Sequence, residues 1–148
     1  MGGEMRTYGG MVMRILLVED NPADVRLVQE AFKESHSESG LSVVFDGVEA
    51  LAFLRREGRY TDAPRPDLVV LDLNMPKKNG HQVLSEMKAD PQLRIIPVMI
   101  LSSSFLPEDR EKTLALGAVR YVVKPQEFSE FLQLVHLIED VGLTPGPR

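Results

Sequence analysis

Residues 14–25 read RILLVEDNPADV, and this stretch contains the transition that decides the fold. Its apolar run Ile15–Val18 has the length of a strand and no polar residue in alternation, which is typical of a strand covered on both faces. Asn21, Pro22 and Asp24 then supply an N-cap, a proline at the first helical position and an acid in the first turn. The stretch therefore predicts a buried strand followed at once by a helix.

The alternation of strand and helix continues along the chain. Four further apolar runs are separated by longer amphipathic or polar stretches, and these runs are Leu41–Phe45, Leu68–Leu71, Ile95–Leu101 and Val119–Val123. Strands that alternate with helices predict βαβ units and a parallel sheet. We expect one α/β domain of five units over residues 13–141, with a disordered, glycine-rich tail at residues 1–12 and a C-terminal tail at residues 142–148.

Capping and stop signals give the helix boundaries. Asp46 followed by Glu49 predicts a capping box at the start of a second helix, which should end near Gly58. A third helix is expected over residues 80–89 and a fourth over residues 107–117. The last helix has the clearest helical period, and its expected core stripe consists of Phe128, Phe131, Leu132, Val135 and Ile138.

Composition excludes several classes of function. The chain has 17 basic and 22 acidic residues and a net charge of −5, the wrong sign for a domain that binds nucleic acid phosphates. No stretch approaches the run of apolar residues that a membrane span needs. The absence of cysteine excludes disulfides, thiolate metal sites and cysteine nucleophiles, and it fits a reducing compartment. We therefore expect a cytoplasmic protein with no nucleic acid or membrane partner.

Polar side chains follow four of the five expected strands. These are Glu19 and Asp20 after the first strand, Asp72 after the third, Ser102 after the fourth and Lys124 after the fifth. Ligands of parallel α/β sheets bind at the carboxyl ends of the strands. We therefore expect three carboxylates, a hydroxyl and an ammonium to lie together at one edge of the sheet.

Taken alone, most of these groups also have a structural explanation. Glu19 or Asp20 could cap the first helix. Ser102 could lie in a turn, and Lys124 could extend over the surface. Asp72 is harder to explain in this way, because an ionised carboxylate at the end of a buried strand is costly unless a cation or hydrogen-bond donors satisfy it.

Taken together, the groups indicate a metal site for phosphoryl chemistry. Crowded carboxylates repel one another unless positive charge is supplied, and oxygen ligands without His or Cys favour Mg²⁺. A carboxylate can then act as a nucleophile and form an acyl phosphate. Lys124 and the Ser102 hydroxyl would neutralise charge on the transferred oxygens.

Four motifs in order make the chain resemble the receiver domain of two-component response regulators, and these are ILLVEDN, LDLNMPKKNG, PVMILSSS and GAVRYVVKP. Three further segments, NPADVRLVQEA, REGRYTDAPRPDL and DPQLRIIPV, resemble the small stand-alone regulators paired with bacterial phytochrome histidine kinases. The resemblance implies a doubly wound, flavodoxin-like (βα)5 fold with strand order 2-1-3-4-5. It also implies a phosphoacceptor signalling protein that catalyses only its own phosphoryl transfer and dephosphorylation.

The resemblance assigns a role to each site residue. Asp72 would accept the phosphoryl group from a sensor histidine kinase. Mg²⁺ would be held by Asp20, Asp72 and the backbone carbonyl of Asn74, with Glu19 acting through water. Many receivers carry Asp at the position of Glu19, and the replacement keeps the carboxylate.

The same resemblance implies a switch on the fourth and fifth strands. Lys124 would pair with the phosphoryl group, and the Lys124-Pro125 peptide bond would be cis. Ser102, where many receivers have Thr, would hydrogen-bond the phosphoryl group, and Tyr121 would then move inward. Because Leu134 and Leu137 lie off the expected core stripe of the last helix, we also expect a homodimer through that helix and the fifth-strand face.

Two alternatives remain open. A Mg²⁺-dependent phosphatase of the haloacid dehalogenase type also forms an aspartyl phosphate, but its Asp-x-Asp-x-Thr motif follows the first strand, whereas Asp72-Leu73-Asn74 follows the third. A receiver that only scaffolds without being phosphorylated is disfavoured by the complete set of acidic, hydroxyl and lysine groups. A glycine-rich nucleotide-binding loop follows none of the strands.

Overall fold

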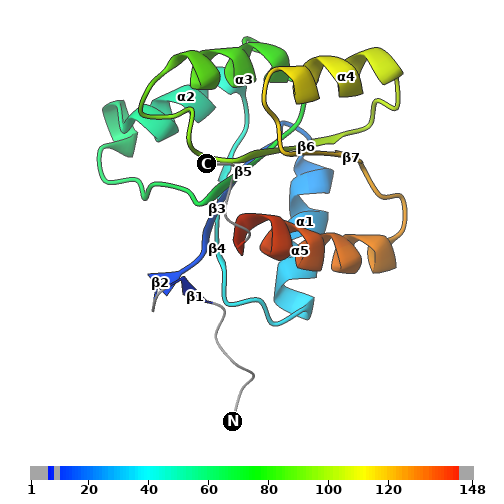
Figure 1. The fold of residues 1–148 in the computed structure, drawn as a ribbon. Helices are drawn as coiled ribbons and strands as arrows, with labels where there is room; N and C mark the ends of the chain where they lie inside the picture. Colours follow the sequence, from blue (N-terminus) through cyan, green and yellow to red (C-terminus); the bar gives the residue numbers. More distant parts are fainter. Residues whose placement is uncertain (1–6, 9–10, 144–148) are drawn as a thin grey trace.

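The computed structural model describes residues 7–8 and 11–143 (Figure 1). Five parallel strands form one sheet in the order β4-β3-β5-β6-β7, which is the expected order 2-1-3-4-5 of the βα units. The strands are β3 (Arg14–Val18), β4 (Gly40–Val44), β5 (Leu68–Leu71), β6 (Val98–Ser102) and β7 (Arg120–Val123). The predicted fold class is confirmed.

Helices cover both faces of the sheet (Figure 1). α1 (Pro22–Glu34) and α5 (Phe128–Leu143) lie on one face, and α2 (Gly47–Arg55), α3 (Gly80–Ala89) and α4 (Pro107–Ala115) lie on the other. A short 3-10 helix, η1 (Gly58–Tyr60), follows α2. Within the described part of the chain, no helix is both long and apolar enough to cross a membrane.

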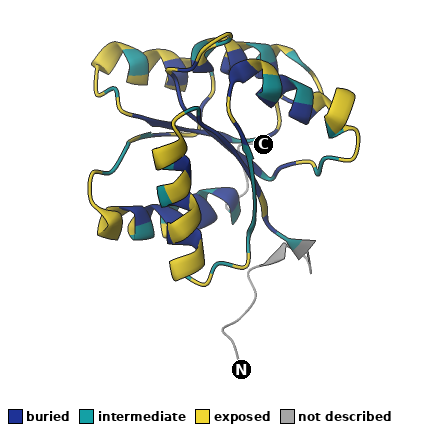
Figure 2. Cartoon of the chain, turned by 180° about the vertical axis from the view of Figure 1, so that it is seen from behind, coloured by how far each residue is buried: buried dark blue, intermediate teal, exposed yellow. Residues whose placement is uncertain are grey.

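Alternate residues of each central strand enter two separate cores. In β3, Leu16 and Val18 pack in the cluster formed with α2 and α3, whereas Ile15 and Leu17 pack in the cluster formed with α1 and α5. This double burial explains the continuous apolar runs of the sequence. Figure 2 shows the result, with buried strands between helices whose outer faces are exposed.

Local capping starts the helices where the sequence predicts them. The Asn21 side chain accepts hydrogen bonds from the Ala23 and Asp24 amides, so Asn21 caps α1 and Asp20 does not. Asp46 caps α2 by accepting from the Glu49 amide, but the Glu49 side chain turns toward η1 and the expected capping box is incomplete. α2 also ends earlier than expected.

One strand boundary and one helix face also differ from the sequence prediction. Ile95 lies before β6 and is 73% exposed, so the apolar run from residue 95 does not begin as a strand. In α5 the buried apolar stripe includes Leu134, which is 4% exposed, while Phe128 is 40% exposed. The prediction that Leu134 lies off the stripe is therefore wrong. The packing of α5 on α1 selects this face of the helix, and the helical period alone leaves it open.

The expected tails overlap elements of the structure. Thr7–Tyr8 (β1) pairs antiparallel with Met11–Val12 (β2), and α5 continues to Leu143. This pairing is made by backbone hydrogen bonds, which any residue other than proline can form, so the composition of the segment does not predict it. The expectations for residues 1–6, 9–10 and 144–148 lie outside the described residues.

Candidate metal centre

The predicted site residues meet at the carboxyl ends of the central strands. Asp72, which follows β5, donates its amide proton to the Val18 carbonyl at 3.0 Å, and this fixes it beside the end of β3. Lys124, which follows β7, donates its amide proton to the Ser102 carbonyl at 2.8 Å. The parallel register therefore brings together side chains that lie far apart in the sequence.

Three carboxylates form a compact cluster at this edge. Glu19, Asp20 and Asp72 each offer an oxygen atom within 4.8 Å of the others. Glu19 is 1% exposed and Asp72 is 4% exposed, whereas Asp20 lies nearer the surface. Because Asn21 caps α1, capping does not account for Asp20.

The cluster fits a hard divalent cation. The Asp72 Oδ1 atom is buried and has no hydrogen-bond partner, which leaves a charged oxygen without compensation. All three side chains offer carboxylate oxygens, and no histidine or cysteine belongs to the cluster among the described residues. Oxygen ligands of this kind suit hard divalent ions such as Mg²⁺ or Mn²⁺.

Lys124 neutralises part of the negative charge. Its Nζ lies 2.8 Å from Glu19 Oε1, 2.9 Å from Asp24 Oδ2 and 3.7 Å from Asp72 Oδ2. Burial opposes the charged ammonium, but the hydrogen bonds to Glu19 and Asp24 outweigh it, and the pKa of Lys124 is raised. Lys124 therefore stays protonated across the physiological range.

Burial disfavours the charged form of both inner carboxylates. It raises the pKa of Glu19 to about 7, with a smaller contribution from the charge of Asp72. It also raises the pKa of Asp72, against the opposing attraction of Lys124. In the absence of a cation, both carboxylates therefore hold protons more tightly than exposed carboxylates do.

Ser102 and Tyr121 are connected through Ser104. The Ser102 Oγ atom is fully buried and accepts a hydrogen bond from the Ser104 amide at 3.1 Å. The Tyr121 hydroxyl donates to the Ser104 carbonyl at 2.7 Å, and the side chain is 7% exposed. Tyr121 therefore occupies an inward position in this structure, and its predicted movement stays a prediction.

Two acidic residues join the site that sequence reasoning did not assign to it. Asp24 pairs with Lys124, and the only signal was its place in the first turn of the helix that follows Asp20. Asp109 of α4 accepts hydrogen bonds from the Ser104 hydroxyl at 2.5 Å and lies 3.3 Å from His81 Nε2. Nothing in the local sequence indicates this second contact, because it joins α3 to α4.

The expected cis peptide bond is not present. All peptide bonds between described residues are trans, including that between Lys124 and Pro125. The trans form is the lower in energy even before proline. Lys124 reaches Glu19 and Asp24 from the trans arrangement, so no cis bond is needed for this contact.

Known proteins share both the sequence and the fold. The response regulator receiver domain model matches residues 15–136. Response regulator Rcp1 of Synechocystis sp. is 43% identical over 129 residues, which cover 87% of this chain and 88% of the relative. The crystal structure of the phosphorylated cyanobacterial phytochrome response regulator RcpA has a TM-score of 0.83 and 45% identity, covering 92% of this chain and 97% of that chain. The Mn²⁺-bound form of Rcp1 has a TM-score of 0.80 and 41% identity, covering 91% and 97% of the two chains.

Proposed function

Because the chain belongs to the response regulator receiver family, we propose that Asp72 is its phosphoacceptor and that a sensor histidine kinase is the donor. A receiver is a phosphoacceptor signalling protein, phosphorylated on an aspartate, and it does not turn over a separate substrate as a haloacid dehalogenase phosphatase does. The observation that carries the choice of Asp72 is its buried Oδ1 atom, which has no hydrogen-bond partner. The Asp72 carboxylate lies beside those of Glu19 and Asp20, and its other oxygen, Oδ2, is 3.7 Å from Lys124 Nζ.

In the proposed transfer, an Asp72 oxygen forms a bond to phosphorus while the bond from phosphorus to the kinase imidazole nitrogen breaks. The electron pair of the broken bond stays with the imidazole. Lys124 lies 3.7 Å from Asp72 Oδ2, so its ammonium can turn from Glu19 and Asp24 toward the arriving phosphoryl oxygens. The Ser102 hydroxyl donates a hydrogen bond to one of these oxygens.

We propose Mg²⁺ as the ion of this site, held by Asp20, Asp72 and the carbonyl of Asn74, with Glu19 acting through water. When bound, the ion neutralises negative charge on the carboxylates and on the phosphoryl group. Rcp1 binds Mn²⁺ in its crystal structure, and Mn²⁺ shares the preference for oxygen ligands. Mg²⁺ is the ion that commonly joins carboxylates to phosphates.

The kinase partner is proposed to be of the phytochrome type. RcpA is a cyanobacterial phytochrome response regulator, and it is 45% identical to this chain over nearly its whole length. A reducing cytoplasm, where such kinases present their phosphohistidine, is the proposed location of the chain.

The face formed by α4, β7 and α5 is the proposed output surface, and a second copy of the chain is its proposed partner. A groove of about 550 Å³ on this face is lined by Tyr121, by apolar residues that include Leu114, Val119 and Leu137, and by Arg110 and Arg120. Leu114 is 38% exposed and Val119 is 41% exposed, which leaves apolar surface for a partner to cover. Because Ser104 hydrogen-bonds both Ser102 and Tyr121, it is the proposed link that carries a change at Ser102 to this groove.

Phosphotransfer from a purified phytochrome kinase tests the donor and the acceptor together. The kinase is first labelled with radioactive phosphate and then mixed with the wild-type chain or with Asp72→Asn in the presence of Mg²⁺. We expect rapid loss of label from the kinase only with the wild type. Equal transfer to Asp72→Asn would place the phosphoacceptor elsewhere, and the absence of any transfer would exclude this kinase type.

Sedimentation tests the output surface. We expect phosphodonor and Mg²⁺ to shift the wild type toward a dimer and Leu137→Glu to remain monomeric. Monomers throughout for the wild type would exclude self-association. Dimers that persist in Leu137→Glu would move the interface to another face.

A further inference from the structure

The loop of residues 73–79 carries the proposed carbonyl ligand, and its path is set at its far end by a close contact with α3. The Gly80 amide donates to the Leu73 carbonyl at 2.9 Å, which closes the loop on itself. A Cβ atom at Gly80 would lie 2.7 Å from the Leu73 Cα and closer still to the Asp72 carbonyl oxygen. Neither neighbour can yield, because both are backbone atoms.

The part of the loop nearest α3 packs against the first turn of α2 at Lys78. A Cβ atom at Gly47 would lie 2.8 Å from the Lys78 carbonyl carbon and closer still to its oxygen, so only glycine allows this approach. The φ angle of Gly47 is not positive, so the requirement for glycine at this position is steric and not conformational. The N-terminus of α2 and the loop thus meet backbone to backbone.

An ion pair also joins the start of α2 to the loop. Asp46 is buried, and its Oδ2 lies 3.4 Å from Lys77 Nζ, while its Oδ1 caps α2 through the Glu49 amide at 2.8 Å. Lys77 adopts a left-handed backbone with φ of 67°, a conformation that needs support in a residue other than glycine. One carboxylate therefore starts α2 and holds the loop.

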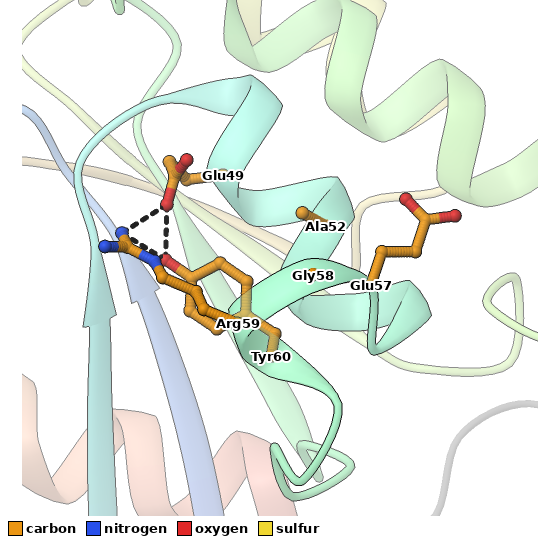
Figure 3. Close-up of a pocket in the computed structure, with 6 residues that line it drawn as sticks. All are labelled: Glu49, Ala52, Glu57, Gly58, Arg59 and Tyr60. Atoms are coloured by element: carbon orange, nitrogen blue, oxygen red, sulfur yellow. Dashed lines mark hydrogen bonds and ion pairs between the residues drawn. The ribbon is translucent and has the colours of Figure 1, made fainter.

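η1 supports α2 from the other side. Figure 3 shows the Arg59 and Tyr60 side chains reaching Glu49, whose Oε1 accepts a hydrogen bond from each of them. The Tyr60 ring also packs against Phe53 of α2, with ring centroids 5.3 Å apart. Since Glu49 lies in the first turn of α2, this contact keeps that turn from moving away from the loop.

We propose that Asp46 and Gly47 are positioning residues that set the backbone of the loop so that the Asn74 carbonyl faces the carboxylate cluster. This inference rests on the proposed function, which makes that carbonyl a metal ligand. It predicts that changes at α2, which contributes no ligand, alter metal affinity. Groups that hydrogen-bond a metal ligand directly are worth about 10- to 100-fold in affinity, and Asp46 and Gly47 act on the ligand through Lys77 and Lys78, so we expect an effect near the lower end of that range.

Calorimetric titration of Mg²⁺ into metal-free Gly47→Ala tests the proposal. We expect affinity to fall by about tenfold, and the rate of phosphorylation by a small-molecule donor to recover at high Mg²⁺. Gly40→Ala is the matched control, because a Cβ there has no neighbour closer than the Met13 carbonyl oxygen at 3.9 Å. It should bind as the wild type does.

A pair of charge variants keeps the test decisive if Gly47→Ala fails to fold. Asp46→Asn retains a capping side chain, and Lys77→Met retains the length of the lysine. If the ion pair positions the loop, both variants weaken Mg²⁺ binding. If it acts only through net charge, Lys77→Met tightens binding, and this result overturns the proposal.

The outcomes separate this inference from the function on which it rests. Wild-type affinity in a folded Gly47→Ala overturns the positioning role alone. A wild type that binds no Mg²⁺ overturns the proposed metal site and the inference with it.

Discussion

Lys124 is the residue on which the charge balance of the site depends. It contacts Glu19 and Asp24 and is the only cation paired with the carboxylate cluster among the described residues. We expect Lys124→Ala to lower the stability of the metal-free protein by about 3 kcal/mol, because buried carboxylates lose their partner. The Asp72 adduct should still form in this variant, because Lys124 is not the nucleophile.

The larger effect of Lys124→Ala should be on signalling. The phosphoryl group carries nearly two negative charges, in place of the single charge of the Asp72 carboxylate, and the Lys124 ammonium is the group placed to respond to the increase. We expect the variant to lose the phosphorylation-dependent change in sedimentation while mass spectrometry still detects the adduct. Lys124→Arg, which keeps the charge, is the control. A normal response in Lys124→Ala would show that the lysine has no part in the switch.

Glu19 gives the metal-free protein a distinctive pH dependence. Its pKa is raised from 4.5 to about 7 in the folded state, mainly by burial. Its contribution to stability is therefore fully present below pH 4.5 and is lost as the pH rises through about 7. Glu19→Gln cannot titrate at this position. In the presence of a chelator, its stability should therefore fall less between about pH 5 and about pH 8 than that of the wild type. Parallel urea-denaturation profiles for the two proteins would contradict this assignment.

The β6–α4 connection is the element that joins the site to the surface. Ser104 contacts Ser102 through its amide, Tyr121 through its carbonyl and Asp109 through its hydroxyl. Asp109 also lies within reach of His81 on α3. The connection is therefore held from three elements at once.

Removal of Asp109 should loosen this connection. We expect Asp109→Ala to cost about 1 to 2 kcal/mol, since a charged acceptor of two contacts is lost, and to increase the access of reagents to Tyr121. Nitration followed by mass spectrometry measures this access, with Tyr60 as the internal reference. Asp109→Asn retains an acceptor for Ser104 and should change less. Unaltered nitration of Tyr121 in Asp109→Ala would mean that the loop is held by other contacts.

Sequence patterns predict where helices and strands lie better than they predict which face of a helix is buried. The start of α1 follows from the capping signal Asn21-Pro22, and the end of α3 follows from the stop signal Asp90-Pro91. Both agree with the structure. The buried face of α5 does not follow from its own sequence, because apolar residues occupy more than one stripe and the packing on α1 decides between them.

At the scale of the whole molecule, the site could be predicted because its residues lie at the carboxyl ends of parallel strands. Each of Glu19, Asp72 and Lys124 follows directly from a strand, and a parallel sheet gathers such positions whatever their separation in sequence. Asp24 and Asp109 lie on helices, and their contacts depend on how those helices dock. Contacts of this second kind require the tertiary structure.

The most direct test of the account is whether Asp72 accepts a phosphoryl group. The protein is incubated with Mg²⁺ and a small-molecule phosphodonor and then weighed by mass spectrometry, with Asp72→Asn as the control. The account predicts one added phosphoryl group on the wild type and none on Asp72→Asn. A folded wild type that gains no phosphoryl group, or an Asp72→Asn variant that gains one, would contradict it.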